Sequence, residues 1–342
     1  MLAAVLQGPH TLVVQDVDEP HPAPDEVLVD VEVAGVCGSD VALFQAKRPA
    51  AYPLILGHEA IGRLVGDGRR VVVEPNIPCG TCPVCRRGKG NVCPRKRSLG
   101  LNSPGVFAER VAVPAAFVHP VPDAIGPLDA VGIEPLAVAV HAVAVGTLAP
   151  AQPVAVIGCG TEGLLLVQVA AAVGARVLAA DVRPERLHLA RRLAADGTLL
   201  LPSGDGAAGE ALDRVREEWS PSVVFEAAGS AAAVDAALRM VVNGGSVVLL
   251  GLAASAVDVV PLRFVRRGLS LLGSLIYDHP DDFRHTLDLI RSGRVQPSAL
   301  VSHVSCLAET ASVLHAMAAG RPGKTVLDVA GVLRTDSNRC EE

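Results

Sequence analysis

The sequence predicts an α/β protein with a β-rich domain and a doubly wound parallel sheet. Three observations lead to this prediction. Residues 1 to about 110 form short apolar runs separated by Gly, Pro and Asp, which is typical of strands joined by turns. From Val154 onward, apolar β-branched runs alternate with helical segments, as expected for a parallel sheet with crossover helices. The length of 342 residues also suits two domains.

In the β-rich half, strands are expected at Thr11–Val17, Glu26–Val33, Ala60–Val65 and Arg70–Glu74. An Ala/Val-rich helical stretch then leads to Pro150 and Pro153, which mark a joint. The pattern changes again after about Asp278, where the chain is expected to return to the first domain. We therefore assign residues 1–145 and 279–342 to the β-rich domain and 146–278 to the second domain. The tail from Thr335 is expected to be disordered.

The second domain contains six apolar runs that predict a six-stranded parallel sheet. These runs are VAVIG, VLAAD, TLLL, VVFEA, SVVLLG and LSLLG, and the helices between them include Glu185–Ala195, Ala207–Glu218 and Ala231–Val241. Beyond it, helices are expected near Asp281–Ser292 and Ala308–Ala318, and strands near Leu300–Val304 and Thr325–Val329.

The first strand of this domain is followed by the sequence GCGTEG, which predicts a dinucleotide site. Its glycines are Gly158, Gly160 and Gly163. The first permits a tight turn, the second lets backbone amides approach a pyrophosphate, and the third lets the helix pack on the strand. Glycine is frequent here, so about 0.3 chance matches of this triplet are expected. The strand before it and the apolar run after it make the interpretation stronger.

Asp181 ends the next apolar strand, where an acidic side chain accepts hydrogen bonds from the adenosine ribose. An acid at this position favours NAD over NADP, because it would repel the 2′-phosphate. Arg183 and Arg186 leave this preference open, since a nearby arginine can accommodate that phosphate. Asp181 could also be an ordinary residue of a turn.

Four cysteines in the β-rich half, Cys79, Cys82, Cys85 and Cys93, have the spacing C-x2-C-x2-C-x7-C. Four thiolates with short spacers suit tetrahedral zinc, and a site closed by four sulfurs is structural. Buried free thiols and disulfides are the alternatives. We call residues 79–93 the cysteine lobe. Basic residues lie in it and just after it, at Arg86, Arg87, Lys89, Arg95, Lys96 and Arg97. A nucleic-acid-binding zinc ribbon would look similar, but stacking aromatics are lacking, so a solvated surface is favoured.

A second group of potential ligands consists of Cys37, His58 and Glu59, with Glu134 as a possible further member. Each residue alone has an ordinary structural explanation. Together they provide a thiolate, an imidazole and carboxylates, which is the mixed ligand set of an open, catalytic zinc site.

Composition excludes several functional classes. The formal net charge is −6, which offers no global attraction to nucleic acid or to an anionic membrane. The N-terminal MLAAVLQGPH has no basic leader, and no apolar run reaches about 18 residues, so neither a signal peptide nor a membrane span is expected. The chain is expected to be cytoplasmic, with its eight cysteines reduced and their clustering explained by metal.

These motifs together resemble those of the zinc-dependent medium-chain dehydrogenases/reductases. The matching pieces are GVCGSD at 35–40, GHE at 57–59, the cysteine lobe, IEPLAVAVHA at 133–142, GCGTEG and GKTVLDV at 323–329. Glu134 in EPLA favours the branch of polyol (sorbitol-type) and threonine dehydrogenases. The resemblance implies a GroES-like catalytic domain built from both termini, a Rossmann domain that binds NAD, and a homodimer or homotetramer.

The resemblance also implies roles for individual residues. Cys37, His58 and Glu59 resemble the ligands of a catalytic zinc, and Glu134 the acid that binds this zinc directly or through water. Asp40 resembles the carboxylate that orients the histidine ligand, and Ser39 the hydroxyl that relays the proton, although Ser39 could be a simple turn residue. Cofactor contacts are implied for Asp181, Arg186, Gly251 and Leu252. Two zinc ions per chain are expected.

The implied reaction is hydride transfer between a secondary alcohol and the nicotinamide, with zinc as Lewis acid. The substrate would be a polyol, a sugar derivative or an amino alcohol. Many relatives have a histidine where this chain has Ala42, which leaves the usual proton relay in doubt. Two alternatives remain open: a quinone or enal reductase, and a non-catalytic protein on the same fold that acts as a redox sensor or binds nucleic acid through its basic residues.

Overall fold

The computed structural model describes residues 1–202, 208–321 and 323–333. The predicted disorder from Thr335 lies outside these residues, as does Ala207, the first residue of a predicted helix. The chain forms two compact units. Unit 1 contains Met1–Glu134, Asp278–Phe283 and the chain from Pro297, and unit 2 contains Pro135–Tyr277 and Arg284–Gln296. The domain boundaries expected from the sequence, at 145/146 and 278/279, stay a prediction.

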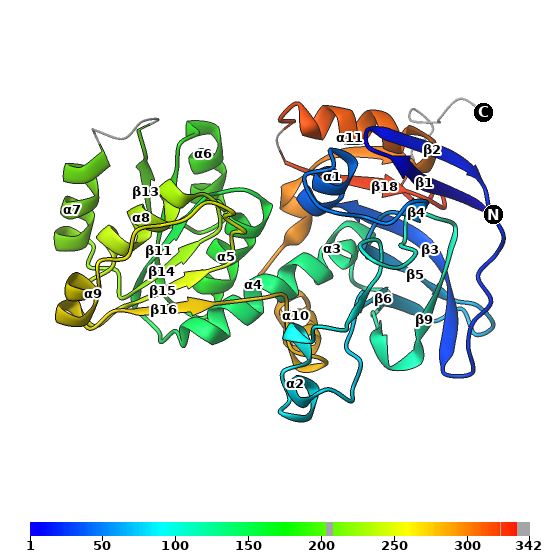
Figure 1. Ribbon diagram of the computed structural model, residues 1–342, viewed down its shortest axis with the longest axis horizontal. Helices are drawn as coiled ribbons and strands as arrows, with labels where there is room; N and C mark the ends of the chain where they lie inside the picture. The colour runs from blue at the N-terminus through cyan, green and yellow to red at the C-terminus, as the bar shows by residue number, and fades with distance from the viewer. Residues whose placement is uncertain (203–207, 322, 334–342) are drawn as a thin grey trace. The chain divides into compact units, whose positions relative to one another are not determined.

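Unit 1 is built from three β-sheets and short helices (Figure 1). A three-stranded sheet has the order β2 (Thr11–Asp16), β1 (Leu2–Gly8), β4 (Leu54–Ile55). A seven-stranded sheet has the order β10 (Val118–Pro120), β6 (Arg70–Val73), β5 (Glu59–Leu64), β3 (Glu26–Val36), β18 (Lys324–Asp328), β17 (Val301–Cys306), and β9 (Arg110–Pro114) also pairs with β3. A ribbon of β7 (Asn76–Ile77) and β8 (Arg97–Ser98) completes the set. The helices are α1 (Gly38–Phe44), α2 (Pro83–Arg86), α3 (Pro127–Val131) and α11 (Thr310–Ala318).

Strands from the N-terminal and the C-terminal parts of the chain pair in the seven-stranded sheet. Strand β18 runs antiparallel to β3, with Thr325 opposite Val36, and parallel to β17. Apolar side chains of the strands pack with those of the helices in one core, and within it Phe44 of α1 meets the edge of His315 of α11 at a ring separation of 4.8 Å. The C-terminal segment is therefore an integral part of unit 1.

Unit 2 has a six-stranded sheet in which every neighbouring pair is parallel. Its order is β13 (Gly197–Leu200), β12 (Arg176–Asp181), β11 (Pro153–Ile157), β14 (Val223–Glu226), β15 (Ser246–Leu249), β16 (Ser270–Gly273). The helices are α4 (Ile133–Gly146), α5 (Thr161–Ala172), α6 (Pro184–Arg192), α7 (Ala208–Glu218), α8 (Ala231–Met240), α9 (Pro261–Arg267) and α10 (Asp281–Arg291), of which α4 and α10 each cross a boundary between the units.

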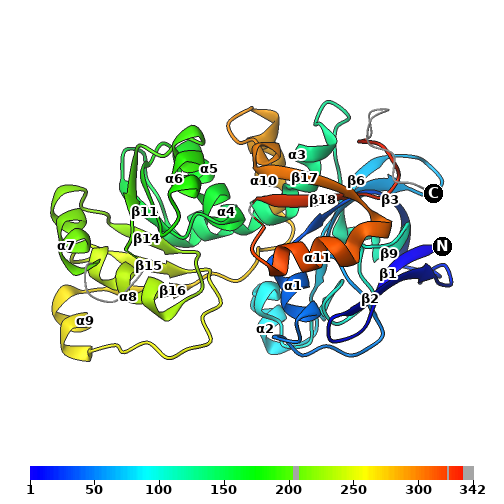
Figure 2. The same cartoon turned by 90° about the horizontal axis from the view of Figure 1, so that it is seen from above.

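Helices cover both faces of this sheet, with α4, α5 and α6 on one face and α7 and α8 on the other (Figure 2). The strand order is that of a doubly wound dinucleotide-binding fold, whose ligands bind at the carboxyl ends of the strands where the order reverses. The six predicted apolar runs all form strands of this sheet, which confirms the predicted doubly wound architecture.

Within the described residues, none of the helices combines the length and the apolar character required to cross a bilayer.

Candidate active site

Cys37 and His58 are brought together by the pairing of β3 with β5. These strands are antiparallel, and Gly35 near the end of β3 lies opposite Glu59 at the start of β5. Residues that follow one strand and precede its antiparallel neighbour necessarily lie close in space. The two predicted ligands therefore meet although 20 residues separate them in the sequence.

Asp40 holds both ligands in place. It lies in the first turn of α1, where its Oδ2 accepts a hydrogen bond of 2.8 Å from the backbone N–H of Cys37. Its Oδ1 lies 3.3 Å from Nδ1 of His58, and its side chain is fully buried. This contact leaves Nε2 of His58 to face a ligand, which is the arrangement that orients a metal-binding imidazole.

The environment of His58 also sets its charge. Burial disfavours the charged imidazole, but the attraction of the Asp40 carboxylate and the hydrogen bond to it raise the pKa of His58 well above the ordinary histidine value. Ser39 lies on the other side of the ring, with its Oγ 3.3 Å from Nε2. The predicted relay hydroxyl is thus next to the nitrogen that would bind a metal.

Glu59 is completely buried and is paired with Lys324 of β18, whose Nζ lies 2.5 Å from its Oε1. The carboxylate also lies against Gly35, where an added Cβ would be 2.1 Å from Oε2. Cys37, His58 and Glu59 form one group whose potential ligand atoms all lie within 4.8 Å of one another. A half-buried thiol, a buried imidazole and a buried carboxylate at this separation fit zinc.

Glu134 lies in the first turn of α4 and is also buried. Among the residues that the structure describes, its carboxylate does not belong to the group of ligand atoms around Cys37. The structure therefore unites three of the four residues proposed for the catalytic zinc, and the roles of all four stay predictions.

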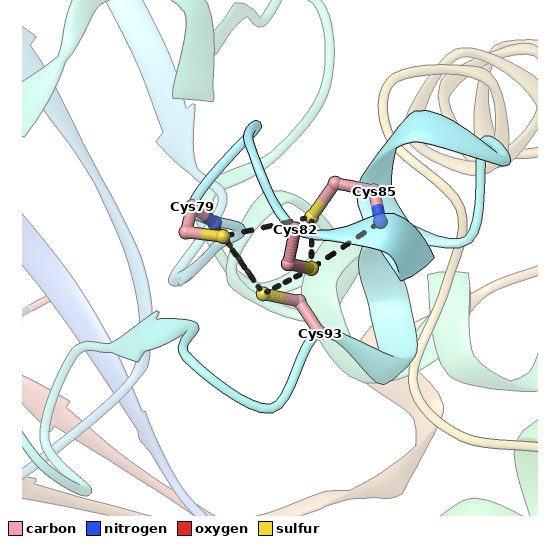
Figure 3. Close-up of side chains that lie close together, drawn as sticks. All are labelled: Cys79, Cys82, Cys85 and Cys93. Atoms are coloured by element: carbon pink, nitrogen blue, oxygen red, sulfur yellow. Dashed lines mark hydrogen bonds between the residues drawn. The ribbon is translucent and has the colours of Figure 1, made fainter.

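The four cysteines of the cysteine lobe converge on one point (Figure 3). Their Sγ atoms are separated by 4.0 Å for Cys79 and Cys85, 3.4 Å for Cys82 and Cys85, 3.8 Å for Cys82 and Cys93, and 3.6 Å for Cys93 and Cys79. Zn–S bonds of about 2.3 Å at tetrahedral angles place sulfurs about 3.8 Å apart. The four cysteines are free thiols, so the disulfide alternative is not observed.

The electrostatics of the cysteine lobe also fit a cation. Hydrogen bonds from backbone N–H groups, that of Thr81 foremost, lower the pKa of Cys79 to about 5, whereas burial and the neighbouring sulfurs raise the pKa of Cys85 to about 12. Four thiolates so close together repel one another, and a divalent ion at their centre offsets that repulsion. The residues present therefore fit a closed zinc site.

The three fingerprint glycines of unit 2 have different local surroundings. Gly158 has φ of +92°, and a Cβ there would lie 2.6 Å from the backbone nitrogen of Ala228. A Cβ on Gly163 would be 1.7 Å from the carbonyl oxygen of Gly158. Gly160 precedes α5, and a Cβ there would meet no atom within 4 Å, so this side of the helix N-terminus is open to a ligand.

A cavity of about 420 Å³ lies beside the fingerprint. Its lining includes Gly158, Asp181, Arg183, Arg186, Ser230 and Arg239. Asp181 is almost fully buried and accepts hydrogen bonds from the backbone N–H groups of Cys159 at 2.7 Å and Arg183 at 2.9 Å. Arg186 lies 3.4 Å from the same carboxylate. The structure thus places Asp181 and Arg186 together in the cavity wall, and their contact with the adenosine ribose stays a prediction.

Gly251 and Leu252 are not in the lining of this cavity. A Cβ on Gly251 would lie 2.2 Å from the nitrogen of Gly229, and Leu252 is largely exposed. Sequence reasoning missed Ser230 and Arg239. Both lie on or next to α8, and the only sequence evidence for them was that α8 follows the carboxyl end of a strand of the predicted parallel sheet.

Comparison with known proteins agrees with the fold. Residues 23–123 match the family model "Alcohol dehydrogenase GroES-like domain", and residues 163–292 match "Zinc-binding dehydrogenase". L-galactonate-5-dehydrogenase from Escherichia coli K12 is 32% identical over 327 residues, which cover 91% of this chain and 94% of that protein. Sorbitol dehydrogenase from Bacillus subtilis is 30% identical over 326 residues, 91% of each chain.

A solved structure of a zinc-binding dehydrogenase from Sinorhizobium meliloti 1021, bound to NADP, has the same fold. It superimposes with a TM-score of 0.88 at 32% identity, and the alignment covers 96% of this chain and 98% of the other.

A GroES-like β-rich unit with a cluster of side chains that could bind zinc, followed by a doubly wound nucleotide-binding unit, is the architecture of a zinc-dependent alcohol oxidoreductase. The chain belongs to the zinc-dependent medium-chain dehydrogenase/reductase family, in its polyol (sorbitol-type) branch. It is therefore an enzyme that transfers a hydride between a secondary alcohol and a nicotinamide cofactor. The alternative of a non-catalytic protein on this fold is not supported.

Proposed function

We propose that this enzyme oxidises a secondary alcohol of a polyhydroxylated compound, such as a polyol or a sugar acid, with NAD. The observation that carries the proposal is the arrangement of Cys37 and His58, which Asp40 holds with ligand atoms facing one another. The named substrates of two relatives, L-galactonate and sorbitol, are both open-chain polyhydroxy compounds. An amino alcohol remains the second candidate substrate class.

The residues have distinct roles in this proposal. Zinc, when bound by Cys37, His58 and Glu59, supplies Lewis acidity toward the substrate oxygen. Asp40 fixes the imidazole, because its contact to Nδ1 leaves Nε2 as the ligand atom. Ser39 takes the hydroxyl proton, since its Oγ lies next to Nε2. Glu134 is proposed as a further acid of the site, reaching the zinc directly or through water.

For the cofactor, we propose NAD in the cavity of unit 2. Asp181 would accept hydrogen bonds from the ribose hydroxyls, with Arg186 beside it, while Gly158, Gly160 and Gly163 let the pyrophosphate approach α5. Gly251 and Leu252 are proposed to contact the nicotinamide. The buried carboxylate of Asp181 disfavours a 2′-phosphate. There are two reasons to test NADP as well: the arginines around Asp181, and the NADP bound in the solved relative.

A second zinc in the cysteine lobe is proposed as structural, because its four sulfurs leave no open position. We further propose a cytoplasmic homo-oligomer, a dimer or a tetramer. Clustered free thiols placed as metal ligands suit a reducing compartment.

The decisive experiment is reduction of NAD and NADP by the zinc-loaded enzyme across polyols, sugar acids, cyclitols and amino alcohols. One class should turn over, and Cys37→Ser and His58→Asn should lower kcat/KM by roughly 10³-fold or more, which corresponds to ~4 kcal/mol of transition-state stabilisation. His285→Asn, at an exposed position of α10, is the matched control and should retain activity. Unchanged turnover in Cys37→Ser would refute the proposed site, and turnover of amino alcohols alone would favour the second substrate class.

A further inference from the structure

A third cluster of metal-competent side chains lies in unit 1, separate from Cys37 and from the cysteine lobe. It consists of Glu74, His119 and His279, whose potential ligand atoms all lie within 4.8 Å of one another. Glu74 follows β6, His119 lies in the neighbouring strand β10, and His279 precedes α10. The antiparallel pairing of β10 with β6 brings the first two together. His279 lies 160 positions after His119 in the sequence.

The carboxylate of Glu74 is the centre of this cluster. Its Oε2 lies 2.7 Å from Nε2 of His119 and 2.7 Å from Nδ1 of His279. The side chain of Glu74 is 1% exposed, that of His119 10% and that of His279 30%. The other oxygen, Oε1, is buried and has no hydrogen-bond partner among the residues that the structure describes.

Aromatic rings hold both imidazoles in place. Phe117 stacks on His279 with a centroid separation of 4.3 Å, and Phe283 stacks on His119 at 4.7 Å. These contacts fix the planes of the two rings, and the carboxylate that both rings approach is itself buried. A charge or polar atom in such surroundings is costly unless it is compensated.

We propose that Glu74, His119 and His279 bind a divalent transition-metal ion of the zinc type, as a third metal site of this chain. Two imidazoles and one carboxylate are the donor set of open zinc sites, and the nitrogen donors disfavour magnesium and calcium. The exposed edge of His279 gives the ion access and leaves room for a water ligand. The ion would also compensate the carboxylate, including its unpartnered oxygen.

A purely hydrogen-bonded cluster explains this arrangement of Glu74, His119 and His279 less well than a metal site does. Both imidazoles approach the same oxygen, while the second oxygen of the carboxylate is left without a partner. A buried polar atom without a partner has a cost that a hydrogen-bonded bridge would avoid by using both oxygens. Bonds of about 2.1 Å at tetrahedral angles separate ligand atoms by about 3.4 Å. The distance from each imidazole nitrogen to Oε2, now 2.7 Å, would therefore increase only slightly when the ion binds.

The test uses the full-length protein with its first two sites loaded with zinc, to which Co²⁺ alone is then added. The wild type should bind one further equivalent, with d–d absorption but without the thiolate-to-cobalt charge transfer that the cysteine-containing sites would give. Binding should also raise Tm. His279→Phe keeps a ring to stack on Phe117 and removes the ligand nitrogen, so it should lose the additional equivalent and the rise in Tm.

The matched control is His285→Phe, which removes an exposed histidine of α10 and should bind cobalt as the wild type does. Both variants should retain two zinc ions and turn over alcohol within about twofold of wild type, since the cluster is separate from the proposed active site. The proposal is overturned if wild type binds no cobalt beyond two metals per chain, if the additional band shows thiolate charge transfer, or if His279→Phe still binds it.

Discussion

At the scale of single residues, the proposed active site has one buried carboxylate that makes two contacts. Asp40 accepts the backbone N–H of Cys37 with one oxygen and faces His58 with the other. The family resemblance implied this residue, and the structure shows that it reaches back to Cys37 within a single turn of helix. The contact to His58 depends on strand pairing, which local sequence does not specify.

Replacing Asp40 by Asn tests its role in positioning. The amide oxygen can still accept from Cys37, but the negative charge next to His58 is lost. We expect kcat/KM and zinc affinity to fall about 10–100-fold, as for other groups that orient a metal-binding histidine. Steady-state kinetics and zinc content measure this, with Asp67→Asn at an exposed turn as the control. Full activity and full zinc content in Asp40→Asn would show that His58 needs no such partner.

Asp181 determines the choice of cofactor in our proposal. Asp181→Ser removes the negative charge that disfavours a 2′-phosphate and leaves Arg183 and Arg186 in the cavity wall. We expect the ratio of kcat/KM for NADP to that for NAD to rise at least about 10-fold, which corresponds to ~1.4 kcal/mol. Adding Arg186→Ala should reverse part of this gain. An unchanged ratio would mean that Asp181 does not contact the ribose.

At the scale of elements, sequence prediction succeeds where the pattern is local. The strands of unit 2 and the fingerprint turn could be read from short apolar runs and glycine spacing. Strand β1 and helix α1 were missed. Strand β1 lies in a run with little alternation, and α1 is only seven residues long and begins with Gly-Ser-Asp. Such short elements are set by tertiary contacts, which propensity does not include.

Two glycines of the fingerprint turn should respond differently to alanine. A Cβ on Gly163 would overlap the carbonyl of Gly158, so Gly163→Ala should lower the free energy of unfolding by at least about 2 kcal/mol. A Cβ on Gly160 meets no protein atom within 4 Å, so Gly160→Ala should fold normally but raise KM for the cofactor. Thermal denaturation and kinetics separate the two effects. Equal loss of stability in both variants would contradict this division of roles.

The cysteine lobe is expected to depend on its metal. Cys93→Ser replaces one of the four converging thiol ligands by a hydroxyl, which binds zinc more weakly. Once the zinc is lost, no cation offsets the repulsion between the remaining thiolates. We expect one zinc per chain to be lost and Tm to fall, because binding of a structural zinc contributes directly to folding. Metal analysis after dialysis provides the measurement. Loss of both zinc ions would instead indicate that the two sites are coupled.

At the scale of the whole molecule, the residues that meet at a site come from distant parts of the sequence. Family motifs predicted Cys37 and His58, and spacing predicted the four cysteines. Nothing local links Glu74 to His279, which is 205 positions away. The pairing of Glu59 with Lys324 was missed for the same reason, since only the completed sheet brings these two residues together.

Lys324 connects the last strand of unit 1 to the first half of the chain. Lys324→Met leaves the completely buried Glu59 without this ammonium group, and breaking a buried ion pair in this way costs about 3–5 kcal/mol. Urea denaturation should show that loss in the free energy of unfolding. Lys89→Met, whose ion pair with Asp278 is largely exposed, should change it by less than about 1 kcal/mol. Similar values for both variants would argue against the importance of the buried pair.

The position of β18 in the sheet also governs the order of events during synthesis. This strand lies between β3 and β17, yet it ends at Asp328, near the end of the chain. Unit 2 is complete in the nascent polypeptide once Gln296 has emerged from the ribosome. The central sheet of unit 1 can close only once β18 has been made, and β18 follows all of unit 2 in the sequence. Glu59, which lies beside Cys37 and His58, therefore gains its partner Lys324, 265 positions further along the chain, only after unit 2 has been made.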